Sequence, residues 1–345
     1  MSKSLPSSSP SPRRVDGVTW RSVLLALILM WPNAYWVTHM EIVRYSGHPT
    51  TVSLFFNVVF ILLVLLSLNE LVKRIKQAWA LTRQELLVVY VMLAIASTLV
   101  GHDLIQVLTP QLSHPHRFAT ASNQWRDIFF QYLPDWLMVK DPVALKGAYE
   151  GTNSFWGLYQ PQHYRPWLGP VLWWTLFISA MVLSLLCLNT ILRKRWTENE
   201  KLSYPLTQIP LELTDLSKRW WLNSWFLMGF GIAAFISLVN GFNALYPQVP
   251  LIKTRVVHYD EFMNSLWTQR PWTALRGTRL SFYPFGVGLG LLLPVDLLFS
   301  CWFFFIFSRL QLVVSAAFGW DQIPQFPYIR QQSFGAYIAI AIAAL

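Results

Sequence analysis

Long apolar runs separated by charged segments dominate the hydropathy pattern of this chain. These runs fall near residues 22–39, 52–69, 85–101, 167–192, 221–245, 283–308 and 334–345. A helix needs about 20 mostly apolar residues to cross the hydrocarbon core of a bilayer. The pattern therefore predicts an all-α, polytopic membrane protein with six full spans. The seventh run stops after about a dozen residues, too few to cross, so we expect the chain to be the N-terminal part of a longer one.

The charged segments between these runs predict the orientation of the spans. Sixteen of the 27 Lys and Arg residues fall in four segments that alternate with outer segments, one falls in the short loop 41–50, and ten fall in two longer loops. Because Lys and Arg accumulate in cytoplasmic loops, this distribution predicts a cytoplasmic amino terminus. Residues 1–18 are rich in Ser and Pro, which is typical of a disordered tail.

The segments outside the spans differ in length and character. Residues 101–166 and 246–282 are predicted to be extracytoplasmic, and the first is too long to be structureless in a compact protein. We expect short helices at the membrane surface or a small cap there. Residues 193–220 form a charged cytoplasmic hub, in which Tyr204-Pro205 and Ile209-Pro210 are predicted to interrupt any helix.

Composition supports a membrane protein and narrows its partners. Apolar residues make up 54% of the chain and charged residues 13%, whereas about a quarter of the residues of a soluble domain are charged. The net charge of +10 reflects Lys and Arg at span ends, so the predicted partner is the lipid bilayer and not nucleic acid. Cys187 and Cys301 lie in apolar runs and are interpreted as packing residues.

One acidic residue inside a span is the strongest candidate for chemistry. Asp296 follows Pro294 and three alternate glycines, Gly286, Gly288 and Gly290. A carboxylate in the membrane is costly and marks a functional site by default, and a glycine-rich span broken by proline is typical of the discontinuous helices of transporters. The alternative is a kinked helix in which Asp296 pairs with a polar residue of a neighbouring span.

Further candidates lie at the span ends. His102 and Asp103 close the third span and are candidates for an outer gate, whereas Glu198 and Glu200 of the hub are candidates for an inner gate. Neither His102-Asp103 nor His114-Pro115-His116 has a spacing diagnostic of a metal site. We therefore expect no metal and no cofactor. The chain also lacks the phosphate-binding loop of ATPases and the common hydrolase motifs.

Three stretches carry a resemblance to a known family. Residues 82–92 read Thr-Arg-Gln-Glu-Leu-Leu-Val-Val-Tyr-Val-Met, residues 195–205 read Arg-Trp-Thr-Glu-Asn-Glu-Lys-Leu-Ser-Tyr-Pro, and residues 299–304 read Phe-Ser-Cys-Trp-Phe-Phe. In this order they resemble an uncharacterised family of large bacterial polytopic membrane proteins, which implies the bacterial inner membrane. The Glu-x-Leu-x-Tyr-Pro pattern of the second stretch resembles, more distantly, a segment of the oligopeptide and yellow-stripe-like transporters.

The resulting hypothesis is secondary transport of a small polar solute, peptide-like or metal-chelate-like, coupled to an ion gradient, by a protein that is not an enzyme. One alternative is a membrane enzyme acting on a lipid-linked or envelope saccharide at the outer face. Its carboxylates would come from Asp103, Asp127, Asp135, Asp141 and Glu150. Another alternative is a non-catalytic assembly subunit, and a homo-oligomer is compatible with all three.

Overall fold

The computed structural model describes residues 17–45, 47–51, 54–154, 156–199, 204–215, 223–255 and 259–343, and in these ranges every regular element is helical. The all-α class is thereby confirmed. The chain divides into two compact units. The first comprises residues 1–202 and 206–216, and the second comprises residues 203–205 and 217–345.

Five helical stretches in the described ranges are long and apolar enough to cross a membrane. They are Trp20–Val43, Gln77–Phe118, Pro161–Asn199, Ser224–Leu245 and Val295–Phe318. Each overlaps one of the predicted runs, and together they indicate a multi-pass membrane protein.

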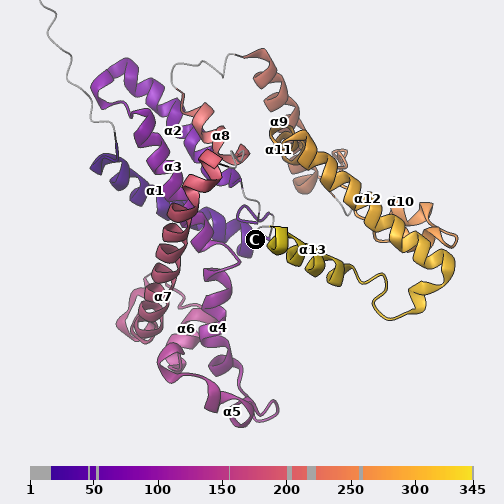
Figure 1. Cartoon of the computed structure of the whole chain (residues 1–345). Helices are drawn as coiled ribbons and strands as arrows, with labels where there is room; N and C mark the ends of the chain where they lie inside the picture. Colours follow the sequence, from indigo (N-terminus) through magenta and orange to yellow (C-terminus); the bar gives the residue numbers. More distant parts are fainter. Residues whose placement is uncertain are drawn as a thin grey trace, which may run out of the picture. The chain divides into compact units, whose positions relative to one another are not determined.

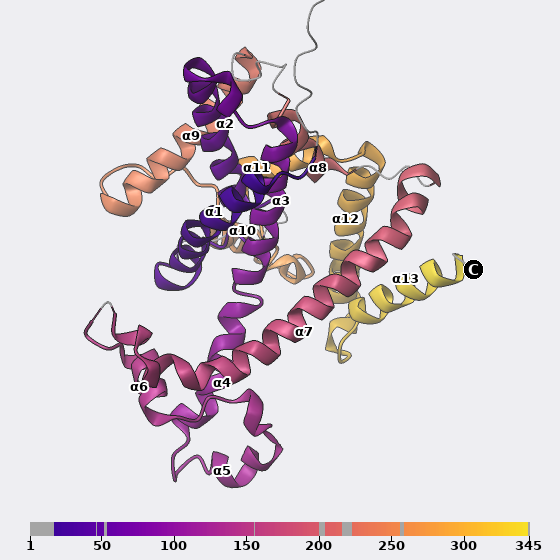
Figure 2. The ribbon, with the colours of Figure 1, turned by 90° about the vertical axis from the view of Figure 1, so that its left-hand side faces the viewer.

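Helices α1 (Trp20–Thr38), α2 (Phe56–Ile75) and α3 (Arg83–Val100) form a three-helix bundle in the first unit. They lie side by side in both ribbon views (Figure 1, Figure 2). The apolar side chains of these helices that are at most 1% exposed are Ala26, Val37, Val58, Leu62, Leu86, Val89 and Leu93. Helices α1 and α3 run parallel, because Thr19 bonds to Glu85 at their starts and Asn33 bonds to Ser97 further along both. The intervening helix α2 therefore runs antiparallel to both.

Polar side chains fix the connection from α2 to α3. The Asn69 amide donates to the Leu81 carbonyl at 3.0 Å and accepts from the Leu81 backbone N–H at 2.6 Å, which ties the end of α2 to the residue before α3. A capping box then starts α3, since the Thr82 hydroxyl accepts from the Glu85 N–H and the Glu85 carboxylate accepts from the Thr82 N–H.

The C-terminal end of α1 differs from the prediction. Residues 41–50 were expected to form a loop, but α1 continues through a π-helical turn, His39–Val43. The helix also passes through Pro32 without ending. As a result, Glu41 lies on the bundle and is fully buried.

Residues 101–166 fold into short helices. These are α4 (Ile105–Phe118), α5 (Trp125–Ile128), α6 (Pro142–Glu150) and three single 3-10 turns. They gather beyond the end of α3 in both ribbon views (Figure 1, Figure 2). A small core of Val139, Ala144 and Leu145 packs against Trp167 and joins this group to the next helix.

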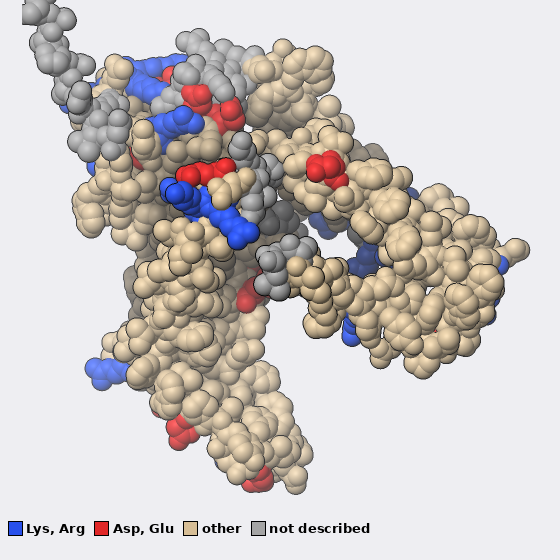
Figure 3. All heavy atoms as spheres, in the orientation of Figure 1, with Lys and Arg blue, Asp and Glu red and all other residues tan. Residues whose placement is uncertain are grey.

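Helix α7 (Pro161–Lys194) is longer than the predicted run 167–192 and continues through a π-helical turn, Arg195–Asn199. In Figure 3, charged side chains of the first unit gather over the α2–α3 connection and α8, whereas the shaft of α7 is almost free of charge on the face shown. The prediction that Ile209-Pro210 interrupts any helix in residues 193–220 is wrong, because α8 (Pro205–Leu213) contains Pro210.

The second unit consists of α9 (Ser224–Leu245), α10 (Asp260–Leu266), α11 (Pro284–Leu292), α12 (Val295–Phe318) and α13 (Ile329–Ala343). The predicted run 283–308 is thus two helices, separated at Leu293 and Pro294. The segment before α11 reaches the far end of α12, where the Arg270 side chain bonds to the Ala316 carbonyl at 3.2 Å and to Asp321 at 2.7 Å.

This last contact conflicts with part of the predicted topology. Residues 246–282 were expected outside and residues 309–332 inside. Side chains on opposite faces of a bilayer cannot bond to each other, so both assignments hold only if one of the two segments enters the membrane.

Candidate functional site

Three polar side chains form a buried triad between α1, α2 and α3. Asn33, Asn57 and Ser97 are each 0% exposed. The Asn57 amide donates to Asn33 Oδ1 at 2.7 Å and to Ser97 Oγ at 3.0 Å, and the Asn33 amide donates to Ser97 Oγ at 2.9 Å. Each helix supplies one member, so the triad fixes how the three helices are rotated against one another.

A buried carboxylate lies beyond this triad, at the end of the bundle where α1 ends. Glu41 is 0% exposed and accepts four hydrogen bonds. Its Oε1 accepts from the Thr50 N–H at 3.0 Å and the Thr50 hydroxyl at 2.6 Å. Its Oε2 accepts from the His102 backbone N–H at 3.0 Å and the Gln106 amide at 3.1 Å. Glu41 therefore joins the end of α1 to residues 48–51 and to the α3–α4 turn.

Two histidines flank this carboxylate. The rings of His48 and His102 lie 5.2 Å apart, centroid to centroid. Both side chains are half-buried, and the Nδ1 atom of each is buried without a hydrogen-bond partner in the described part of the chain. Glu41, His48 and His102 each offer one ligand atom, and these atoms all lie within 4.8 Å of one another. The group has the donor types of a transition-metal site.

The remaining polar groups around the cluster orient its members. Asp103 Oδ1 lies 3.2 Å from His102 Nε2. This contact favours the tautomer in which Nε2 carries the proton and Nδ1 has a free lone pair. Gln106 donates to Glu41, while its Oε1 is buried and unpaired within the described residues.

Gly101 allows the close approach that the cluster requires. A Cβ atom built at this position would lie 2.5 Å from the Thr50 hydroxyl oxygen and 2.8 Å from Thr50 Cβ. Any larger residue would push Thr50 away from Glu41. The backbone angles of Gly101 are ordinary, so the requirement is for space alone.

Asp296, predicted from sequence as the coupling residue, lies in the first turn of α12 and is exposed. Pro294 is the N-cap of that helix. Gly286, Gly288 and Gly290 lie on α11, where a Cβ atom would meet nothing closer than 3.9 Å among the described residues. The three glycines thus leave room for an approaching backbone.

The predicted gates fall in different surroundings. His102 belongs to the buried cluster, and Asp103 is 77% exposed beside it. Glu198 is exposed in the π-helical turn after α7, and Glu200 lies outside the described residues. The structure therefore brings His102 and Asp103 together with Glu41 and His48. Asp296 belongs to the other unit.

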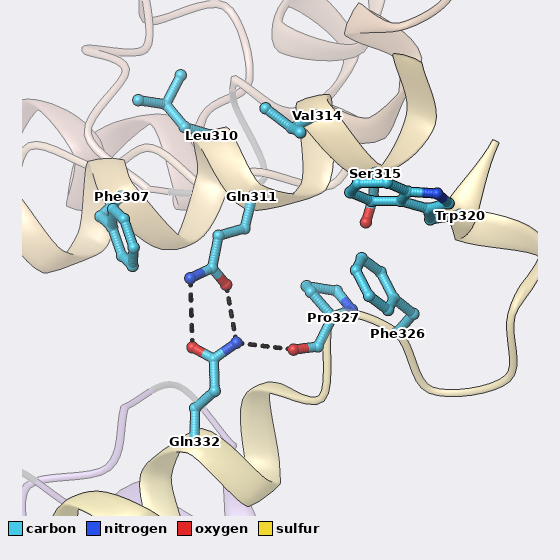
Figure 4. A pocket seen from close by; sticks show the side chains of 9 residues that line it. All are labelled: Phe307, Leu310, Gln311, Val314, Ser315, Trp320, Phe326, Pro327 and Gln332. Carbon is cyan, nitrogen blue, oxygen red and sulfur yellow. Dashed lines mark hydrogen bonds between the residues drawn. The ribbon is translucent and has the colours of Figure 1, made fainter. Parts of the chain in front are cut away.

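The second unit contains a hollow of about 490 Å³ between α12 and α13. Figure 4 shows its apolar wall, to which Phe307, Leu310 and Val314 contribute, with Trp320 and Phe326 at one end. A reciprocal amide pair crosses the opening, since Gln311 and Gln332 each donate to the other at 3.3 Å and 3.0 Å. Gln332 also donates to the Pro327 carbonyl at 2.7 Å.

Sequence reasoning missed the buried triad and Glu41 as parts of a site. Asn33 and Asn57 stand out in apolar runs, and polar residues in spans usually face the bundle interior, so this signal was available. Glu41 was assigned to a loop because the helix was expected to end before it. His48 gave no signal, since only the fold brings it to His102.

These features define a polytopic helical membrane protein with polar groups buried inside its first bundle. Residues 12–345 match a family of unknown function, DUF6785, and the chain therefore belongs to that family. No curated protein and no solved structure matches it. The match agrees with the resemblance to an uncharacterised family and carries no link to the oligopeptide transporters.

Proposed function

We propose that this protein is a secondary transporter of a small polar solute, peptide-like or metal-chelate-like, coupled to an ion gradient across the bacterial inner membrane. The observation that supports this most directly is the helix break at Leu293 and Pro294, followed within one turn by Asp296. In transporters, the ends of discontinuous helices present freed backbone groups and partial charges to substrate or ion.

The bundle geometry supports six spans. Helices α1 and α3 run parallel, and both belong to stretches that can cross a membrane. The chain must therefore return between them, and α2, with 20 residues, is long enough to do so. The six spans are then α1, α2, α3, α7, α9 and the broken pair α11–α12, and α13 opens a seventh.

A re-entrant hairpin explains how Arg270, in a segment predicted to lie outside, contacts the end of α12, which is predicted to lie inside. The base of this hairpin is closed where the Phe282 N–H donates to the Thr254 carbonyl at 2.9 Å. Its tip reaches Ala316 and Asp321. The 3-10 turn Trp272–Leu275 of this hairpin packs against α12. Irregular backbone at membrane depth is tolerated where it lines a water-filled cavity, which a solute pathway would provide.

In this mechanism Asp296 carries the coupling ion or contacts the solute. Gly286, Gly288, Gly290 and Pro294 form the scaffold of the broken span. His102 with Asp103 gates the outer side, and Glu198 with Glu200 gates the inner side. Polar groups buried in α1–α3 would hold the bundle rigid while the broken span moves.

The outer-face enzyme gains no support from the described carboxylates. Glu150 pairs with Arg117, and Asp141 caps α6 by accepting from the Ala144 N–H. The Lys140 ammonium, hydrogen-bonded to Asp135, holds the pKa of that carboxyl below its ordinary value. A general acid needs a raised pKa instead. Three of the five candidate acids are thus engaged in ion pairs or in a helix cap.

The test is electrical. Proteoliposomes containing the full chain are adsorbed on a solid-supported membrane, and currents are recorded under a pH or sodium gradient while di- and tripeptides and ferric or zinc chelates are applied in turn. At least one solute is expected to give a saturable current, which Asp296→Asn abolishes. Asp260→Asn is the matched control, because Asp260 is also a first-turn acid of the same unit. A current that Asp296→Asn leaves unchanged would rule out this mechanism.

A further inference from the structure

We propose that Glu41, His48 and His102 bind a divalent transition-metal cation of the zinc class at the outer end of the α1–α3 bundle. This site goes beyond the transport function. It shares His102 with the proposed outer gate but does not rest on Asp296, which belongs to the second unit. It also differs from the prediction made from the histidine spacing, which indicates no metal site.

The first argument is the state of the two imidazoles. Buried polar atoms without partners are rare and call for a specific explanation. Here two such atoms, Nδ1 of His48 and Nδ1 of His102, belong to rings that lie 5.2 Å apart, centroid to centroid. A cation between them would satisfy both at once. Water could satisfy them too, and metal binding distinguishes the two cases.

The second argument is charge. Glu41 is fully buried, and its partners are neutral groups, two backbone N–H groups, one hydroxyl and one amide. Burying a carboxylate is costly unless it is paired or coordinates a metal. A divalent cation beside Glu41 would supply the missing positive charge. The Gln106 amide is the partner most easily displaced, because it is a side-chain group on a rotatable stem.

The third argument is the position of Asp103. A histidine that binds metal through one nitrogen usually donates its other N–H to a carboxylate or carbonyl, which fixes the tautomer. The His102–Asp103 contact of 3.2 Å is of this kind, and it leaves the buried Nδ1 of His102 without a partner among the described residues. Asp103 therefore acts as a positioning residue.

The donor set and the spacing select the class of ion. Two imidazoles and one carboxylate suit zinc and other transition metals, whereas calcium and magnesium prefer all-oxygen sites. Ligand atoms around a tetrahedral zinc ion lie about 3.3–3.5 Å apart. The three atoms here already lie within 4.8 Å of one another, so small side-chain rotations close the site. The unpaired Gln106 Oε1 is a candidate fourth ligand after rotation of its amide.

The experiment measures binding directly. The full chain is purified in detergent, stripped with a chelator, and titrated with Zn²⁺ by calorimetry. We expect one saturable site per chain. His48→Ala and His102→Ala should each weaken it at least tenfold. His114→Ala is the matched control and should bind as the wild type does, because His114 packs against Phe118 and Trp125, away from the cluster.

A spectroscopic measurement on the wild-type protein identifies the ligand atoms without relying on the folding of a variant. Co²⁺ loaded into the wild-type protein should give a visible d–d absorption band of nitrogen and oxygen ligation, and excess Zn²⁺ should abolish it. Absence of the band, or weak binding of equal strength in the wild type, His48→Ala and His102→Ala, would mean an adventitious ion only and would overturn the proposal.

Discussion

Asn57 occupies the central position among the buried polar residues of the first unit. Its amide supplies the donor for Asn33 and one of the two donors to Ser97. In a membrane bundle, such interhelical hydrogen bonds are worth on average about 0.6 kcal/mol each and at most about 1.7 kcal/mol. Their main effect is on specificity, because rotation of any one helix would break its hydrogen bonds to the other two.

Replacing Asn57 should therefore destabilise the bundle. Asn57→Ala removes two hydrogen bonds and leaves Asn33 Oδ1 buried without a donor, so we expect a loss of about 1–2 kcal/mol of unfolding free energy. Tryptophan fluorescence during chemical unfolding in detergent measures it. Ser67→Ala is the control, since Ser67 is exposed and bonds only to Leu63 of its own helix. Equal stability of the two variants would show that the triad contributes nothing.

Space at Gly101 gives a second prediction. The Cβ atom of Gly101→Ala would overlap the Thr50 side chain, so the 48–51 segment must move and Thr50 must leave Glu41. We expect a cost of about 1–3 kcal/mol, the usual range for overpacking, in the same unfolding assay. Gly169→Ala on α7, where nothing lies within 4 Å, should instead be neutral or slightly stabilising. A neutral Gly101→Ala would refute the close packing.

At the scale of the elements, the broken span is the feature on which the transport proposal depends. Leu293 has extended backbone angles, and Pro294 caps α12 without any side-chain hydrogen bond. Proline holds the break open in two ways, because it cannot donate to a preceding carbonyl and it disfavours helical angles in the residue before it.

Pro294→Ala permits α11 and α12 to join into one continuous helix. We expect a several-fold loss of solute-driven current in the proteoliposome assay with normal expression and monodispersity, because the freed backbone groups at the break become paired within the helix. Pro284→Ala, at the first position of α11, tests proline removal without closing the break and should retain the current. Full activity of Pro294→Ala would show that the break is dispensable.

The elements follow from the sequence more reliably than the site does. Apolar periodicity and length determine where α1, α3, α7 and α9 lie, since a long apolar run has few alternatives in a membrane. The end of α1 was missed because the π-helical turn carries His39 and Glu41, residues typical of a loop. The cluster could not be predicted, because His48 and His102 are 54 positions apart and only the parallel packing of α1 and α3 brings them together.

At the scale of the whole molecule, topology links the fold to the proposed pathway. In the six-span scheme of the transport proposal, the α2–α3 connection would lie inside and residues 101–166 outside, as the distribution of Lys and Arg predicts. The second unit provides the sharpest test of the six-span topology. Helix α12 has 24 residues and is about 36 Å long, enough to cross alone, and the hairpin before α11 reaches its far end.

Cysteine labelling on intact cells tests both parts of this topology. With Cys187 and Cys301 replaced by alanine, single cysteines are placed at exposed positions: Ser122→Cys, Lys76→Cys, Arg279→Cys and Gln322→Cys. A membrane-impermeant maleimide should label Ser122→Cys and Arg279→Cys directly, because they lie in the first long outer segment and at the hairpin base. Lys76→Cys and Gln322→Cys should react only after permeabilisation.

Labelling of Lys76→Cys from outside would show that α2 does not cross. Labelling of Gln322→Cys from outside would put the hairpin base and the C-terminal end of α12 on one face. The hairpin would then need no re-entry, and the cavity that the transport proposal draws from it would lose its support.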